Sequence, residues 1–161
     1  MFETEIIERQ ETRWNDFTAK AEAMELEADY NNPDWQSLKT AFGVSNFVFR
    51  TFLRNPKLPF AIMAEDRLHC ELAADYYKTV LQELTAAVNS EEELSRVLRR
   101  FRYKEMGRLA WRDLAGFAEL NVMTAEWSQL ATARIDVAFD LLYPKLADCF
   151  GMRRTPAGQP V

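Results

Sequence analysis

Apolar residues recur at intervals of three or four along most of this 161-residue chain. One series keeps a spacing of four and runs through Leu72, Tyr76, Val80, Leu84 and Val88. Such spacing places the side chains on one side of a helix. Strands need frequent turn residues, whereas this chain has only five glycines. The sequence therefore predicts an all-α fold, a helical bundle of about five to seven helices, with long helices near 3–30, 71–88, 91–118 and 124–149.

The two ends of the chain differ from its middle. The first segment carries one helical stripe between acidic faces, formed by Ile7, Gln10, Trp14, Phe17, Ala21, Met24 and Ala28. Pro33 ends that pattern, and proline and glycine recur after residue 150. We expect an N-terminal acidic helical arm over 1–32, either packed on the body or docked on a partner. A helical bundle over 33–150 and an exit linker over 151–161, leading toward a further domain, complete the prediction.

Three positions carry signals for helix starts. Ser45 is placed to cap a helix over residues 46–54 by accepting a hydrogen bond from an amide that would otherwise lack a partner. Ser90 and Glu93 form the Ser-x-x-Glu pattern of a capping box, which predicts a helix start near residue 91. Thr124 is a candidate cap for the last helix.

The last helix carries a further stripe, formed by Trp127, Ala131, Ile135, Ala138 and Leu142. Pro144 lacks an amide hydrogen and clashes with the preceding turn. We therefore expect a kink or a break near Tyr143.

The helix expected over 91–118 changes its apolar side near Gly107. The first half gathers its apolar residues on one arc, Leu94, Val97, Leu98 and Phe101. The second half gathers them on nearly the opposite arc, Met106, Leu109, Ala110, Leu114 and Phe117. Either the helix bends there, or its two halves are buried against different neighbours.

Charged residues lie close to those apolar arcs, where a charge is costly unless it is paired. Glu105 can form an ion pair with Arg102 or Arg108, each three positions away. We interpret the group mainly as ion pairs and, as a second possibility, as a contact with another domain or a partner. The candidate contact residues are Arg99, Arg102, Glu105, Arg108, Arg112 and Asp113.

The sequence offers no catalytic, cofactor-binding or metal-binding residue. His69 has no nucleophile motif around it, the five glycines are isolated from one another, and Cys70 and Cys149 are interpreted as buried apolar residues. A net charge of -5 argues against nucleic acid as a partner. No stretch resembles a signal peptide or a membrane span, so we expect a cytoplasmic protein without membrane contact.

Three stretches resemble one enzyme family, the glutamine synthetase adenylyltransferases/deadenylylases. LRRFRYKEMGRLAWRDLAG at 98–116 resembles the helix that precedes the first nucleotidyltransferase domain of that family. ARIDVAFDLLYPKLADCFG at 133–151, with GQP at 158–160, is similar to the approach to that domain. SNFVFRTFLRNPKL at 45–58 is similar to the early helical region of the family. Together the resemblance covers roughly residues 36–160.

This resemblance implies an N-terminal fragment of a bifunctional nucleotidyltransferase. In that family one half removes AMP from a tyrosine of glutamine synthetase by phosphorolysis, and the other transfers AMP from ATP. Glutamine synthetase and the PII signalling protein are the implied partners, and magnesium with ATP or ADP are the implied cofactors of the catalytic domains. The family's paired metal-binding aspartates are missing, because the chain has no Asp-x-Asp pair. We therefore expect a helical support of the AMP-removing half that is inactive alone.

A second hypothesis comes from the charge pattern alone. Acidic residues predominate over residues 1–30, whereas basic residues predominate over 91–113. That asymmetry is also typical of a self-contained helical protein-interaction module.

Overall fold

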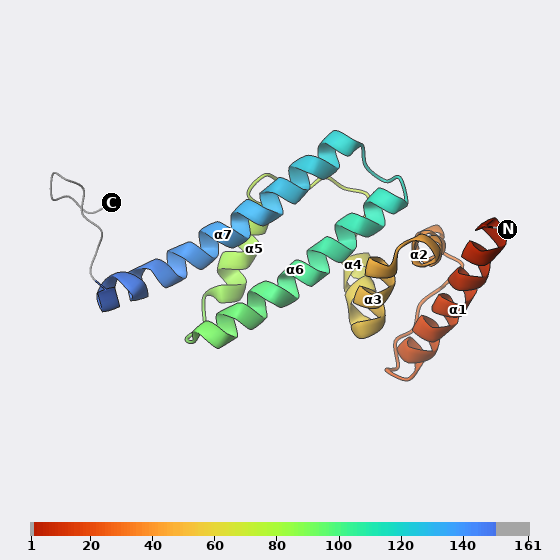
Figure 1. The fold of residues 1–161 in the computed structure, drawn as a ribbon, viewed down its shortest axis with the longest axis horizontal. Coiled ribbons are helices and arrows are strands. Elements are labelled where there is room, and N and C mark those ends of the chain that lie inside the picture. The colour runs from red at the N-terminus through yellow and green to blue at the C-terminus, as the bar shows by residue number, and fades with distance from the viewer. Residues whose placement is uncertain (1, 151–161) are drawn as a thin grey trace. The chain divides into compact units, whose positions relative to one another are not determined.

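The computed structural model of the protein describes residues 2–150, with side chains for residues 4–144, 146 and 147. Within that range it contains seven helices and no strand, which confirms the all-α prediction. None of these helices is both long and apolar enough to cross a membrane. The helices, drawn in Figure 1, are α1 Phe2–Glu22, α2 Pro33–Val44, α3 Asn46–Arg54, α4 Lys57–Ala64, α5 Tyr76–Thr85, α6 Glu91–Leu114 and α7 Leu120–Phe150.

The helices belong to two compact units. Unit 1 is drawn from Met1–Leu72 and Arg102–Trp127, and unit 2 from Ala73–Phe101 and Ser128–Val161. Unit 1 therefore holds α1 to α4 with the second part of α6 and the start of α7. Unit 2 holds α5 with the first part of α6 and most of α7. In unit 1, α1 packs on α2 and α3, so it is a helix of the body.

The first helix is shorter than the expected 3–30, because it ends in a Schellman motif before the proline. The amide of Leu26 donates to the carbonyl of Ala21 (3.0 Å), and the amide of Glu25 donates to that of Glu22 (2.9 Å). Glu25 takes the left-handed conformation that closes such a motif, with φ 56°. This position is usually glycine, so a glutamate there does not indicate the end of a helix.

The sixth helix ends at Leu114, four positions before the expected residue 118, for the same physical reason. The amide of Phe117 donates to the carbonyl of Arg112 (2.9 Å), and the amide of Gly116 donates to that of Asp113 (3.1 Å). Gly116 has φ 70°, and a left-handed glycine stops a helix at little steric cost.

The fifth helix differs from the expected 71–88 in length and in its buried side. It runs from Tyr76 to Thr85, and it buries Tyr77, Leu81 and Thr85, whereas Leu84 of the predicted stripe is half exposed. Thr85 can be buried because its hydroxyl donates to the carbonyl of Leu81 (2.7 Å). Counting apolar residues alone therefore placed the buried side one position too early.

The predicted caps are confirmed at two of three positions. The amide of Val48 donates to the Ser45 hydroxyl (3.2 Å), and the amide of Glu93 donates to that of Ser90 (3.2 Å). Thr124 is not a cap, because α7 begins at Leu120, and the Thr124 hydroxyl instead donates to the Leu120 carbonyl (2.8 Å).

The last helix differs from the prediction along its stripe. Pro144 lies inside α7, which continues to Phe150, so the helix is not broken there, and the expected kink stays a prediction. Ala131 and Ile135 of the predicted stripe are exposed, and the buried side of α7 carries Leu130, Ala133, Val137 and Ala147 instead. Trp127, Ala138 and Leu142 of that stripe are half-buried, so the sequence pattern identified an apolar side that is only partly covered within the described residues.

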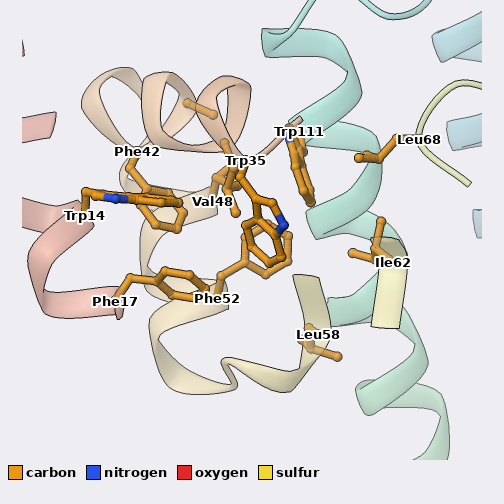
Figure 2. Packing of buried hydrophobic residues seen from close by; sticks show 12 residues of the cluster. Trp14, Phe17, Trp35, Phe42, Val48, Phe52, Leu58, Ile62, Leu68 and Trp111 are labelled. Carbon is orange, nitrogen blue, oxygen red and sulfur yellow. The ribbon is translucent and has the colours of Figure 1, made fainter. Parts of the chain in front are cut away.

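The core of unit 1 is an aromatic cluster, shown in Figure 2, formed by Trp14, Phe17, Trp35, Leu38, Ala41, Phe42, Val48, Phe52, Leu58, Ile62, Leu68 and Trp111. Trp111 of α6 points toward Trp35 of α2, with ring centroids 6.2 Å apart, and its indole nitrogen donates to the Ser37 hydroxyl (2.8 Å). The rings therefore join α6 to the N-terminal helices by apolar burial and one directed hydrogen bond.

The expected change of side along α6 is confirmed, since its two parts contact different neighbours. In unit 2, the ring of Phe101 packs edge-on against Tyr77 of α5 (6.2 Å). In unit 1, the ring of Trp111 packs edge-on against Phe52 of α3 (6.0 Å). The boundary between the units falls after Phe101, which is earlier than the expected switch near Gly107.

Candidate functional site

Three arginines and two glutamates form a buried charge cluster in unit 1: Arg67, Glu105, Arg108, Arg112 and Glu126. None of these residues is more than 6% exposed. One comes from the segment after α4, three from α6 and one from α7. Ionised side chains are rarely buried without a partner, so the hydrogen bonds among them determine what the cluster does.

Glu105 joins the segment after α4 to the middle of α6. Its Oε2 accepts hydrogen bonds from Nη2 of Arg67 (2.7 Å) and Nε of Arg108 (3.0 Å). Nη1 of Arg108 also donates to the backbone carbonyl of Arg67 (3.1 Å). Because Arg108 contacts both the side chain and the backbone of its neighbours, the position of the segment after α4 is fixed against α6.

Glu126 joins α6 to the start of α7. Its Oε2 accepts from Nη2 of Arg108 (2.6 Å), and its Oε1 accepts from Nη1 of Arg112. Burial is the largest single influence and raises the pKa of Glu126, but the hydrogen bonds and the positive charges of Arg108 and Arg112 together outweigh burial and hold that pKa below its ordinary value. Glu126 is therefore a carboxylate at neutral pH and bridges two arginines one helical turn apart.

Two further, more exposed ion pairs lie at the edge of the cluster, and both involve Glu65. Glu65 caps α4 and accepts hydrogen bonds from Nη1 of Arg67 (2.7 Å) and from Nζ of Lys104. Burial alone raises the pKa of Glu65, whereas its bonds to Lys104 and Arg67 lower it more strongly. Arg67 is thus shared between an inner carboxylate and one at the edge.

The hydrogen bonds of the buried charge cluster are not fully satisfied. Its three arginines face two buried glutamates, and Glu65 at the edge supplies a third carboxylate through its bond to Arg67. Among the described residues, Oε1 of Glu105 and Nε of Arg112 have no hydrogen-bond partner. A buried network that is only partly satisfied contributes little net stability. What the cluster supplies is a fixed geometry between α6, α7 and the segment after α4.

A hollow of about 600 Å³ lies beside the cluster, at the turn between α6 and α7. Arg112 and Glu119 line it together with His69 and Glu71. The imidazole Nε2 of His69 lies 2.8 Å from Oδ1 of Asp34. The hollow thus mixes charges of both signs, and its lining selects no single class of ligand.

The structure brings together three of the six predicted contact residues. Glu105, Arg108 and Arg112 all belong to the buried charge cluster, and the predicted ion pair between Glu105 and Arg108 is confirmed. Their charges are used within unit 1, because each side chain is bonded to another member of the cluster.

The other three predicted contact residues lie outside the cluster. Arg102 is half-buried over the ring of Tyr103 (5.0 Å to the centroid), and no ion pair joins it to Glu105 within the described residues. Arg99 and Asp113 are exposed. The interpretation of these three as contacts with a further domain or partner stays a prediction.

The sequence analysis missed two members of the cluster, Arg67 and Glu126. They lie 38 and 18 positions from the α6 residues to which they bond, Glu105 and Arg108. Spacing within one helix cannot reveal such pairs. The one available signal was the excess of arginines on the buried side of α6, which requires acidic partners from elsewhere.

The side chains that the structure describes form no magnesium site. Within the described side chains, no group of three or more His, Cys, Asp and Glu residues could hold a metal ion. The carboxylates of the buried charge cluster are bonded to arginines, which compete with a cation for the same oxygens. Cys70 is exposed, so its interpretation as a buried apolar residue was wrong, while Cys149 lies outside the described side chains.

Comparison with known proteins identifies a family that this chain resembles. The family model described as glutamate-ammonia ligase adenylyltransferase matches residues 35–160, which includes most of α2, all of α3 to α7 and all five members of the cluster. No solved structure matches the chain.

Three relatives carry the printed name bifunctional glutamine synthetase adenylyltransferase/adenylyl-removing enzyme. Those from Shewanella loihica, Nitrosococcus oceani and Pseudomonas putida are 38%, 35% and 35% identical to this chain. The matches cover 78%, 89% and 76% of this chain, but only 13%, 15% and 12% of the respective relatives. The chain thus spans a small part of the length of these relatives. On the family match and these identities, the chain belongs to the glutamate-ammonia ligase adenylyltransferase family.

Proposed function

We propose that this chain is an accessory helical segment of an enzyme that adenylylates and deadenylylates glutamine synthetase. The observation that carries the proposal is the family match over residues 35–160. The relatives are named for both adding and removing the adenylyl group, and they are much longer than this chain. On this proposal, the segment supports the AMP-removing half and is inactive alone.

The contribution of the segment is geometric. In AMP removal, a phosphate oxygen bonds to the phosphorus of AMP, the bond to the tyrosine oxygen breaks, and ADP and free tyrosine are released. We assign no bond-forming step to this segment, and we place magnesium and ATP or ADP in the catalytic domains. The buried charge cluster would hold α6 and α7 in the arrangement that those domains need, because reacting groups must be placed within fractions of an ångström.

The proposal also covers the substrate, the regulatory partner and the location of the whole enzyme. Glutamine synthetase is the substrate, and the PII signalling protein is a regulatory partner. The enzyme works in the cytoplasm. Arg99, Arg102 and Asp113 are proposed as contacts to the rest of the enzyme, since none of them belongs to the buried charge cluster.

A replacement experiment in a relative tests the proposal. The Shewanella loihica enzyme is compared with a variant that lacks the stretch matched by this chain, and with a chimera that carries residues 35–160 of this chain instead. We expect the deletion to slow AMP removal by at least about 100-fold, and to slow AMP addition less. The chimera should restore AMP removal.

Two results would contradict the proposal. One is a folded chimera that does not regain AMP removal. The other is a deletion that slows both activities equally, which would mean that the segment does not favour one half. As a matched control, the isolated 161-residue chain, given adenylylated glutamine synthetase, phosphate and magnesium, should release no ADP above background.

A further inference from the structure

The last helix is apolar on two opposite sides. One side is buried in unit 2 and carries Leu130, Ala133 and Val137. The opposite side carries Ile135, Phe139 and Leu146, whose exposed fractions are 69%, 59% and 54%. A helix that is apolar all round is typically buried between two layers, and here only one side is covered.

The uncovered side is continuous and has no charge. Successive residues of a helix are about 100° apart around its axis, so the residues that lie on the same side as Ile135 form one face of α7 within unit 2. We call it the open face of α7, and its members are Ser128, Ala131, Thr132, Ile135, Ala138, Phe139, Leu142 and Leu146. Ala138 and Leu142 are half-buried, and the other six are exposed. At its edge, the rings of Phe139 and Tyr143 stack with centroids 4.9 Å apart. A stripe of this kind is typical of an interface rather than of a solvated helix surface.

The side of α7 next to the open face carries Asp136, which forms an ion pair within unit 2. Oδ2 of Asp136 lies 3.9 Å from Nζ of Lys78 on α5. The charged residues of the helix are therefore placed beside the open face and not on it. An occupant of this face needs apolar contact and meets no buried charge.

We infer that the open face of α7 docks a charge-free apolar surface from the part of the enzyme that lies outside this segment. The inference rests on the proposed function. The matched stretch is only 12 to 15% of the length of the relatives, so most of their chain lies elsewhere. The family match includes the whole of α7, so the face lies within the region that the chain shares with its family. Covering this face would remove three large apolar side chains from water, Ile135, Phe139 and Leu146, and removing apolar surface from water favours docking.

Cysteine labelling locates the occupant. Ile135→Cys and Phe139→Cys are made separately, with Leu84→Cys on α5 as the matched control, because Leu84 is a 50% exposed apolar residue of the same unit. Labelling by a maleimide is followed peptide by peptide with mass spectrometry, in the 161-residue chain alone and in the chimera. We expect labelling at positions 135 and 139 to be at least about tenfold slower in the chimera, with labelling at position 84 unchanged.

Several outcomes would overturn the inference. Equal labelling of position 139 in the chain and in a folded chimera would mean that nothing docks there. Protection that grows with the concentration of the chain alone would identify a second copy as the occupant. Protection in the chain alone at every concentration would mean that the chain covers the face itself. Protection that requires glutamine synthetase would identify the substrate protein instead.

The test stays decisive if the chimera does not fold. The unlabelled cysteine variant of the 161-residue chain is then mixed with the relative that lacks the matched stretch, and the maleimide is added afterwards. Labelling at the same rate as in the chain alone overturns the inference. Its failure is also distinct from failure of the proposed function. An active chimera with free labelling at position 139 contradicts only the docking face. A protected but inactive chimera contradicts only the proposed function.

Discussion

The aromatic cluster and the buried charge cluster both hold α6 within unit 1, but they do so by different physics. Trp111 and Arg112 are consecutive residues of α6, and one belongs to each cluster. Burying rings is favourable in itself, and the gain depends little on the orientation of the rings. Burying ions is costly, and it is tolerated only where directed hydrogen bonds hold each charge in place. The aromatic cluster therefore supplies stability, and the charge cluster supplies geometry.

The largest expected effect comes from breaking one member of the charge cluster. Glu126→Ala leaves Arg108 and Arg112 buried without their shared carboxylate, which should lower the free energy of unfolding by about 3 to 5 kcal/mol. Urea unfolding of the 161-residue chain measures this loss. Glu83→Ala, an exposed glutamate on α5, should stay within about 0.5 kcal/mol of the wild type. A loss below about 1 kcal/mol for Glu126→Ala would show that the two arginines do not depend on this carboxylate.

The next effect tests how closely α6 approaches the aromatic cluster. A Cβ added at Gly107 would lie 2.8 Å from Cε1 of Phe52, a fully buried ring, so the ring or the helix would have to shift. Gly107→Ala should therefore destabilise the protein by about 1 to 2 kcal/mol, even though alanine favours a helix. Gly107→Ala combined with Phe52→Leu should recover part of the loss in the same unfolding assay. An increase in stability from Gly107→Ala alone would mean that the ring is free to move.

A smaller loss of stability is expected when the cap of α3 at Ser45 is removed. Ser45→Ala removes the hydroxyl that accepts from the amide of Val48 at the start of α3. We expect a loss of about 1 kcal/mol in thermal or urea unfolding, with Ser45→Asp close to the wild type because it keeps an acceptor. Equal losses for both variants would exclude capping as the role of Ser45.

The smallest expected effect on the charge cluster is a loss of stability at low pH. Because the pKa of Glu126 is lowered in the folded protein, this carboxylate contributes stability above its ordinary value of 4.5, and that stability is lost as the pH falls through the lowered pKa. The free energy of unfolding should therefore decrease below about pH 4.5, and less steeply in Glu126→Gln. Parallel curves for the two proteins would show that Glu126 titrates alike in the folded and unfolded chains.

The sequence predicted those features that depend on near neighbours. The all-α class, the cap at Ser45 and the ion pair between Glu105 and Arg108 each need residues within a few positions. The ends of helices were harder to predict when a left-handed residue closed them. Glu25 does so without being a glycine, and the stop therefore carried no recognisable signal.

Features that join distant parts of the chain could not be predicted. Arg67 and Glu126 complete the charge cluster from other segments, and nothing in the spacing of α6 identifies them. The side of α7 that carries Ile135 was apolar enough to be read from the sequence, but it is uncovered in this chain. A periodic pattern shows that a side is apolar and leaves open which partner covers it.

On the proposed function, the buried charge cluster positions α6 and α7 and adds little to their stability. The most direct test measures AMP removal by the chimera after all five members are replaced with apolar residues, Arg67→Met, Glu105→Leu, Arg108→Met, Arg112→Met and Glu126→Leu. We predict that the variant stays folded, with a free energy of unfolding within about 2 kcal/mol of the parent chimera, and that it removes AMP at least about tenfold more slowly. An equally stable variant with the full rate of AMP removal would contradict the claim.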